Sequence, residues 1–477
     1  MSINESVVRD TANFTPTPPD LTSQNIGISD PGQFVLVTAK LYLNNLQPFE
    51  LKPSMVELCI KEDLFSFASS GYILITDSSG FIEKFNITGF NYIEIVFSKT
   101  GNSDPNALKH SRIYRVFSIG KRFQTSRTNE QYAIEFCSEE ILLSEQIRIA
   151  KGYNERYISN MILDIVYEYL ETSEKKVNII EETKGKYSFV IPNLRMFEAI
   201  SWLSTYAQPV NTSHVGADMI FYENRDGYNF RSLQSIMSDE IYNSYHYSPQ
   251  NLAQTSLNYD SNAMVSYKFT KLFDTLEAIK SGAFANKVIA LDPLIRNVDV
   301  RTFDYEKYFD QSKHLNTDKV TTGFVNRFGK KVNEMYDSVV KVATTNADQR
   351  SLDAIKNYSP RSVAPPIGLE VYIPNRTAQL SLINYTKVEF VIPGDPGLAV
   401  GSIVNLGIPS YSSPESITKS NLDEYHSGRY LVSAISHIMV GPNGSYYCNV
   451  EAIKDSVSKP NSTFISDTPE GRDIAEA

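Results

Sequence analysis

Two short clusters contain the residue types needed for acid–base catalysis. Asp423-Glu-Tyr-His426 places two carboxylates beside an imidazole, and Glu181-Glu182 resembles the carboxylate pair of a glycoside hydrolase. Neighbouring residues of an extended segment point to opposite sides, so the two glutamates cannot flank one bond together. Ser427-Gly428 and a strand pattern directly follow the first cluster, which favours a solvated turn. Carboxylates that are distant in the sequence could still meet in the folded chain.

Histidine and cysteine are too dispersed for a metal site or a disulfide framework. No histidine is followed two to four residues later by His or Cys, as a zinc site would require. Three cysteines, Cys59, Cys137 and Cys448, lie far apart, and we interpret them as small apolar core residues on strands. Trp202 is interpreted as a packing residue. The six histidines are His110, His214, His246, His314, His426 and His437.

The sequence also lacks the short motifs of several enzyme classes. There is no GxGxxG after a strand, no GxxxxGK[ST], no HExxH, no GxSxG and no EF-hand loop. We therefore predict no catalytic, cofactor-binding or metal-binding residue, no cofactor and no enzymatic activity. A subunit interface is expected, but the sequence does not identify its residues.

Composition and charge further restrict the classes of protein to which the chain could belong. The 477 residues contain 45 Lys plus Arg and 55 Asp plus Glu, a net charge of −10, which argues against broad phosphate neutralisation and against a polybasic membrane surface. Apolar residues make up 42%, as in ordinary globular proteins. No apolar run approaches the ~20 residues that span a bilayer, and the N-terminus has no secretory pattern. We expect a chain made in a reducing cytoplasm, with no membrane insertion.

The chain begins with an expected extended arm, residues 1–32, which is polar and rich in proline. A first antiparallel β-barrel domain is predicted for residues 33–138, where short strand patterns alternate with turns. The predicted strands are Phe34–Tyr42, Met55–Ile60, Gly71–Thr76, Asn91–Ser98, Ile113–Arg122 and Gln131–Cys137.

A helical domain is expected for residues 139–210, because the apolar period changes from 2 to 3.6. Ser138 is a candidate N-cap for a helix that Gly152 ends. Apolar residues from Ile158 to Leu170 form one face of the next helix. Asn193 is a candidate N-cap for a third.

A second antiparallel β-barrel domain is predicted from two separate segments, 211–233 and 377–457. The first segment is a hairpin that turns at Asp226-Gly227, and the second ends in a hairpin of Tyr430–Val440 and Tyr446–Ile453. Residues 234–376 form a mixed α/β insertion, with a helix near Asp274–Ser281 and a strand at 287–291. Residues 458–477 are an expected flexible acidic tail. The fold class is α+β and β-rich.

Four segments resemble the baseplate hub proteins of contractile-tailed bacteriophages. Ile73–Phe97 is similar to the opening barrel of these hubs, and Phe197–Leu203 resembles a helix that follows it. Ala283–Pro293 is similar to a later stretch, and His426–His437 with Glu451–Asp455 resembles the last hairpin. The likeness extends from about residue 33 to 456 in the same order. The polar stretch 330–358 and both terminal arms match nothing in the family.

The resemblance implies a ring-shaped homotrimer in the virion tail baseplate, assembled in the host cytoplasm. Two similar barrels per chain would make a pseudo-six-fold ring that adapts a three-fold spike to the six-fold tail tube. Implied partners are the spike or tail-lysozyme protein, the tail tube or tube-initiator protein, the tape measure protein and the baseplate wedge proteins. DNA would pass transiently through the lumen, which we expect to be acidic.

Three other functions stay open. A hub that carries a peptidoglycan hydrolase would need a separate lysozyme-like domain. The hub half of a secretion-system spike complex would need a partner that supplies the triple-stranded spike, since no repeated Val-x-Val-x-Gly strands occur. A carbohydrate-binding tail module would display exposed aromatic pairs on one barrel face.

Overall fold

The computed structural model describes most of the region between the two arms. The described residues are 34–43, 47–85, 87, 89, 91–99, 109–170, 176–210, 218–247, 262–293, 296–321, 336–344, 369–410, 422–441 and 444–459. The predicted arm 1–32 lies outside them, as do residues 460–477 of the predicted tail. Of the polar stretch 330–358, residues 336–344 are described.

The first β-region contains all six predicted strands, within a few residues of the expected ends. In β4, every second residue is buried, which is the pattern of a strand with one face on the core. Neighbouring strands pair antiparallel in the order β3-β4-β7-β6-β5-β1-β2. The elements are β1 (Phe34–Tyr42), β2 (Phe49–Glu50), a short 3-10 helix (Lys52–Ser54), β3 (Met55–Asp63), β4 (Ser70–Asp77), α2 (Phe81–Lys84), β5 (Tyr92–Lys99), β6 (Lys109–Gln124) and β7 (Glu130–Cys137).

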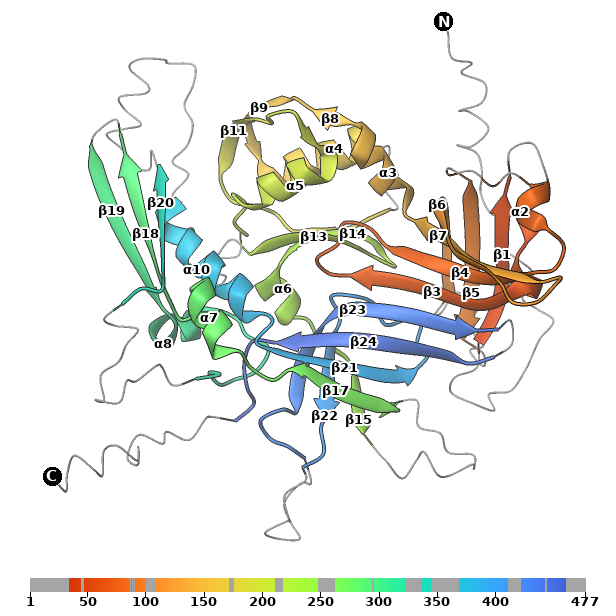
Figure 1. The fold of residues 1–477 in the computed structure, drawn as a ribbon. Coiled ribbons are helices and arrows are strands. Elements are labelled where there is room, and N and C mark those ends of the chain that lie inside the picture. The colour runs from red at the N-terminus through yellow and green to blue at the C-terminus, as the bar shows by residue number, and fades with distance from the viewer. Residues whose placement is uncertain are drawn as a thin grey trace, which may run out of the picture.

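The helical region contains the three predicted helices and several short strands that the sequence did not reveal (Figure 1). The apolar face predicted for the second helix is buried, from Ile158 to Val166. The residues predicted to end the first helix and to cap the third were wrong. The first helix ends at Gln146, and Gly152 instead begins a strand. The third helix is preceded by Arg195, whose backbone amide donates to the Glu198 carboxylate at 3.1 Å. The elements are α3 (Glu139–Gln146), β8 (Arg148–Ile149), β9 (Gly152–Tyr157), α4 (Ile158–Tyr169), β10 (Val177–Ile180), β11 (Lys186–Val190), β12 (Leu194–Arg195) and α5 (Met196–Ser204).

The predicted hairpin is formed by β13 (Met219–Asn224) and β14 (Gly227–Ser232), but its turn residues are Arg225-Asp226, one position before the predicted Asp226-Gly227, and Gly227 begins β14. Gly227 has a φ of 132°, and a Cβ there would lie 2.4 Å from the carbonyl oxygen of Lys176, so only glycine fits. The sequence analysis grouped this hairpin with the second barrel. In the structure, β14 pairs in parallel with β10, and the short helix α6 (Leu233–Met237) follows.

The second β-region takes three strands from the segment that was expected to be an insertion. β17 pairs antiparallel with β21, and β15 pairs in parallel with β16 and β22, so this region is not purely antiparallel. The predicted C-terminal hairpin is confirmed. The strands are β15 (Ile241–Tyr247), β16 (Ala263–Met264), β17 (Ser266–Lys271), β21 (Thr386–Pro393), β22 (Ile403–Gly407), β23 (Gly428–Val440) and β24 (Tyr446–Lys454).

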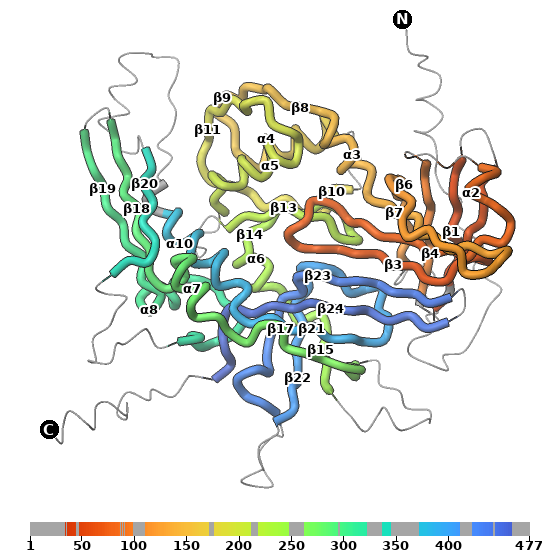
Figure 2. Tube along the Cα trace, in the orientation of Figure 1, coloured from red at the N-terminus to blue at the C-terminus, as the bar shows by residue number. Residues whose placement is uncertain are grey.

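The two β-regions share one hydrogen-bonded sheet. β3 pairs antiparallel with β23, from Glu57↔Val440 to Asp63↔Ala434, which makes a 14-stranded sheet. Figure 2 shows these two strands side by side although they come from opposite ends of the chain. One hydrophobic core includes Leu58 and Ile60 of β3 as well as Ile435 and Met439 of β23. Closure of either region into a barrel stays a prediction.

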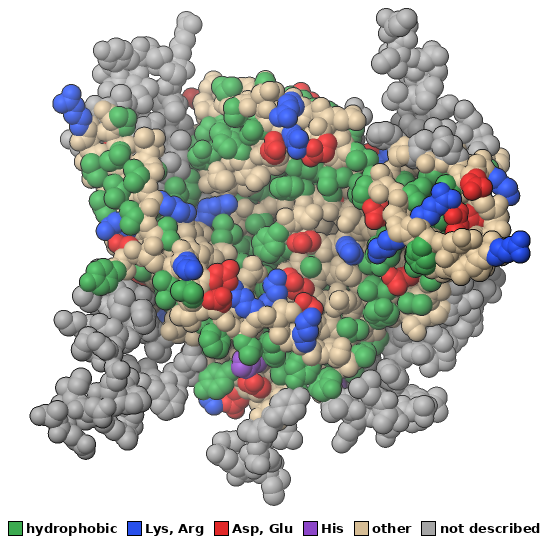
Figure 3. Space-filling view, in the orientation of Figure 1, with side chains coloured by type: hydrophobic (Ala, Val, Ile, Leu, Met, Phe, Trp, Pro, Cys, Tyr) green, Lys and Arg blue, Asp and Glu red, His purple; other side chains and the backbone are tan. Residues whose placement is uncertain are grey.

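The rest of the insertion is a three-stranded sheet of order β19-β18-β20 with helix α10 against β18 and β19. The other face of this sheet exposes aliphatic side chains, among them Val298, Val300, Val340 and Val342, and Figure 3 shows hydrophobic side chains over these strands. The elements are α7 (Thr275–Ser281), β18 (Ala285–Asp292), β19 (Asn297–Asp304), α8 (Tyr305–Tyr308), a short 3-10 helix (Phe309–Gln311), β20 (Val339–Thr344) and α10 (Leu369–Leu382).

Candidate functional site

The Asp423–His426 cluster forms a turn before β23. Asp423 accepts hydrogen bonds from the backbone amides of Tyr425 and His426 at 2.9 and 3.1 Å, and its other oxygen lies 2.7 Å from His426 Nδ1. Partial burial raises the pKa of Asp423, but the hydrogen bonds from His426 and from the two amides lower it more. The carboxylate therefore holds the turn, as the sequence indicated.

The paired glutamates do not face a common point. Glu181 accepts from the backbone amide of Ser232 at 2.7 Å and from its hydroxyl at 3.2 Å, whereas Glu182 is exposed. These contacts fasten the loop after β10 to the end of β14. They do not form the carboxylate pair of a hydrolase.

The three cysteines are buried on β3, β7 and β24, as predicted, and burial raises the pKa of the Cys59 and Cys137 thiols to about 11. Trp202 packs edge-on against Phe189 and Tyr206, with ring centroids 5.3 Å apart in each case. Within the described ranges, no group of three or more His, Cys, Asp or Glu could hold a metal ion. No helix among the described residues is long and apolar enough to cross a membrane.

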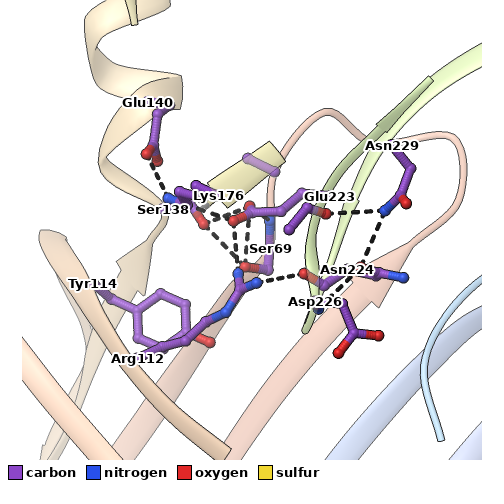
Figure 4. A network of polar contacts seen from close by, with 12 residues as sticks. Ser69, Arg112, Tyr114, Ser138, Glu140, Lys176, Glu223, Asn224, Asp226 and Asn229 are labelled. Atoms are coloured by element: carbon purple, nitrogen blue, oxygen red, sulfur yellow. Dashed lines mark hydrogen bonds and ion pairs between the residues drawn. The ribbon is translucent and has the colours of Figure 1, made fainter. Parts of the chain in front are cut away.

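The strongest concentration of buried charge lies where three parts of the chain meet (Figure 4). Glu223 of β13 is completely buried, and its Oε1 lies 2.6 Å from an Arg112 guanidinium nitrogen of β6. Lys176, just before β10, contacts the same oxygen at 3.6 Å and also pairs with Glu140 of α3. Two carboxylates therefore balance two cations. We call Glu223, Arg112, Lys176 and Glu140 the charged junction.

Neutral donors complete the shell of Glu223. Its Oε2 accepts from the Ser69 amide at 2.8 Å, the Ser69 hydroxyl at 3.2 Å and the Ser138 hydroxyl at 2.6 Å. Burial raises the pKa of Glu223, but Lys176, Arg112 and these hydrogen bonds lower it below its ordinary value. Arg112 also donates to the backbone carbonyl of Asn224. The first β-region, the helical region and the β13–β14 hairpin are thus fastened at one anionic centre.

A second polar junction fastens the insertion to the end of β24. His314 Nδ1 lies 2.6 Å from Asp455, and His314 Nε2 lies 3.0 Å from the carbonyl oxygen of Phe309. Both partners are acceptors, so this geometry favours the protonated imidazole, which donates from both nitrogens. Burial lowers the pKa of His314, but Asp455 and the carbonyl raise it more. The Phe309 ring stacks on the imidazole at 3.8 Å.

A buried carboxylate also lies beside the strand ladder that joins the β-regions. Glu62 of β3 accepts from the backbone amide of Val400 at 3.3 Å, and burial raises its pKa to about 7. The sequence analysis singled out neither Glu62 nor the charged junction. The available signal was a carboxylate inside an otherwise apolar strand, as in Met219–Asn224.

No family model matches the chain. A curated relative, the probable baseplate hub protein gp334 of Vibrio phage KVP40, is 23% identical over 432 residues, which cover 88% of this chain and 94% of the relative. This chain is a distant homologue of a probable phage baseplate hub protein. The family resemblance predicted from the four segments is confirmed by this match.

Solved structures of other tail proteins are similar over comparable lengths. A tail protein of Neisseria meningitidis has a TM-score of 0.48 and 9% identity, with 88% of this chain and 97% of that chain covered. The 43 kDa tail protein of prophage MuSo2 from Shewanella oneidensis has a TM-score of 0.49 and 8% identity, with 88% and 98% covered. The prophage tail protein gp18 of Listeria monocytogenes has a TM-score of 0.44 and 9% identity, with 92% and 100% covered.

Proposed function

We propose that this hub-like structural protein forms a homotrimeric ring at the centre of a contractile-tail baseplate. The ring adapts the three-fold spike to the six-fold tail tube, and its lumen lets the tape measure protein and then DNA pass. The distant homology to a baseplate hub protein supports the place of the chain in the virion. Assembly takes place in the host cytoplasm, without membrane insertion, cofactor or catalysis.

The β3–β23 ladder is the observation that carries this proposal. Three chains can make a ring of six similar units only if each chain contributes two units held in a fixed relation. Here the two β-regions are joined by backbone hydrogen bonds across β3 and β23 and by a shared core. The charged junction adds an ion pair between Arg112 of β6, in the first β-region, and Glu223 of β13.

Exposed sheet edges supply surfaces for contacts between subunits. The main path of the 14-stranded sheet ends at β2 and β16, but both residues of β16 are buried. Among the described strands β17 pairs only with β21, and every second residue of β17 is exposed. Edge strands present unpaired amides and carbonyls that can add a strand from a neighbour. We infer that such edges join adjacent chains. The spike, the tail tube or its initiator, and the wedge proteins are the proposed partners at the remaining surfaces.

Electron microscopy of the chain co-expressed with its spike protein tests the proposal. The expected particle is a ring of three chains with six β-units around a channel, and the spike on one face. A complex in which one copy of this chain binds a whole three-fold spike would contradict the proposed ring.

A further inference from the structure

A shallow groove of about 550 Å³, widely open to solvent, lies on the helical region between α4 and the β9–β11 pair. α4 contributes residues at i, i+3, i+4 and i+7, on the face opposite its buried stripe. The strands contribute most of the charged lining. The groove residues are Asn160, Leu163, Asp164 and Tyr167 from α4, Glu155, Arg156 and Tyr157 from β9, and Lys186 from β11.

The β9 wall of the groove is shaped by a β-bulge. The register steps from Tyr187↔Arg156 to Phe189↔Tyr153, so two β9 residues face Ser188 alone. Glu155, at the bulge, has a φ of 47°, which is a left-handed conformation that costs a non-glycine residue about 1 kcal/mol. The Ser188 hydroxyl accepts from the Glu155 amide at 3.1 Å and so holds this geometry. Bulges and strained residues of this kind are concentrated at binding sites.

The groove combines exposed aromatic rings with unused polar groups. Tyr157 and Tyr167 are 40% and 42% exposed. Their hydroxyls and the side-chain amide of Asn160 make no hydrogen bond to other described residues, so all three are available to a ligand. The Lys186 ammonium lies 5.6 Å from the centre of the Tyr157 ring.

The charge balance excludes several ligand classes. Glu155 and Asp164 offset Arg156 and Lys186, and Arg156 is already paired with Asp164. A phosphate or a nucleic acid would meet two carboxylates in the groove. An apolar ligand would leave the exposed amide and hydroxyl groups without partners. A ligand with apolar faces and many neutral hydroxyls satisfies both the rings and the polar groups.

We propose that this groove binds a neutral saccharide, whose C–H faces pack on Tyr157 and Tyr167 and whose hydroxyls bond to Asn160 and the charged side chains. This activity goes beyond the structural role proposed above and does not depend on it. The aromatic pair lies on the helical region rather than on a barrel face, where the sequence analysis placed it for a carbohydrate-binding module.

The test titrates the full-length chain with neutral tetrasaccharides of glucose, N-acetylglucosamine or rhamnose by calorimetry and ligand-observed NMR. Binding of at least one sugar is expected. Tyr167→Ala and Tyr157→Ala should each weaken it about tenfold or more, which is ~1.4 kcal/mol. Tyr336→Ala is the matched control, because this tyrosine is 68% exposed on a different part of the chain. Both groove tyrosines are exposed, so urea unfolding of the variants should match the wild type.

Two results would overturn the proposal. One is that none of these sugars binds; if the groove variants then also lose co-assembly with the spike, the groove is assigned to a protein partner. The other is that binding survives both groove substitutions.

Discussion

Glu223 is the side chain on which the meeting of three regions depends. It is completely buried, it contacts Arg112 and Lys176, and it accepts from Ser69 and Ser138. Removing one partner from a buried ion pair leaves an uncompensated charge, which is far more costly than the pair itself is stabilising.

Glu223→Gln is therefore expected to lower the free energy of unfolding by about 3 kcal/mol. Glutamine keeps the volume and an acceptor for the serines, but it leaves Arg112 and Lys176 with Glu140 as the remaining carboxylate of the charged junction. Urea denaturation of the purified variant measures the loss. The exposed Glu182→Gln is the control and should change stability little. If Glu223→Gln lowers the free energy of unfolding no more than the control does, the charged junction does not stabilise the fold as proposed.

His314 makes stability depend on pH in a defined direction. Its pKa is raised above the ordinary 6.5 in the folded chain. A group whose pKa is raised on folding stabilises the fold fully when the pH is below its pKa in the unfolded chain. This stabilisation is lost as the pH rises through its pKa in the folded chain.

His314→Gln should therefore destabilise the chain more at about pH 6 than at about pH 9. Urea unfolding of the variant and of the wild type at the two pH values measures the difference. An equal loss at both pH values would mean that the protonated His314–Asp455 pair does not stabilise the fold.

At this scale the sequence predicted little of the site. The turn role of Asp423–His426 and the burial of the three cysteines followed from neighbouring residues. Glu223 could not be placed in the same way, because its partners Ser69, Arg112 and Ser138 are 154, 111 and 85 residues away. Such contacts depend on the tertiary fold and leave no local pattern.

Among the elements, the strands with regular alternation were predictable and the polar or interrupted ones were not. β4 buries every second residue against the core, and β23 does so in its second half, from Ile435 to Met439, so the sequence pattern marks both as strands. β9 is Gly-Tyr-Asn-Glu-Arg-Tyr, and only Tyr153 is buried, so no apolar period marks it. α10 contains Pro374, which sequence reasoning treats as a helix breaker. Pairing partners such as β3 and β23 were not predictable, because they depend on packing.

Gly71 tests how closely β3, β4 and β7 are packed. A Cβ at this position would lie 2.3 Å from the Cys59 carbonyl oxygen and 2.7 Å from the Phe136 ring. Neither the ladder backbone nor a fully buried ring can yield cheaply, so Gly71→Ala should destabilise the chain by about 2–3 kcal/mol. Gly152→Ala is the matched control, because its Cβ would meet Val190 at an ordinary 3.9 Å. Equal urea midpoints for the two variants would contradict this packing.

The whole molecule is organised around one continuous sheet rather than two separate β-domains. The predicted β-rich α+β class is confirmed, and the homology to a probable hub protein extends over 88% of this chain. The sequence did not reveal that β15, β16 and β17 belong to the second β-region. Their parallel and long-range pairings give no signal in a single chain segment.

The net charge of −10 is a property of the whole molecule that bears on the proposed channel. We expect an acidic lumen, because attraction between basic side chains and phosphates would slow the passage of DNA. The composition is compatible with this expectation.

The proposed function requires that the chain works as a ring of three. Light scattering of the purified protein, alone and co-expressed with its spike, measures this most directly. We expect a particle of three times the chain mass of 53.7 kDa, with added mass when the spike is present. A chain that stays monomeric in both preparations would contradict the hub and leave the saccharide groove as the better guide to function.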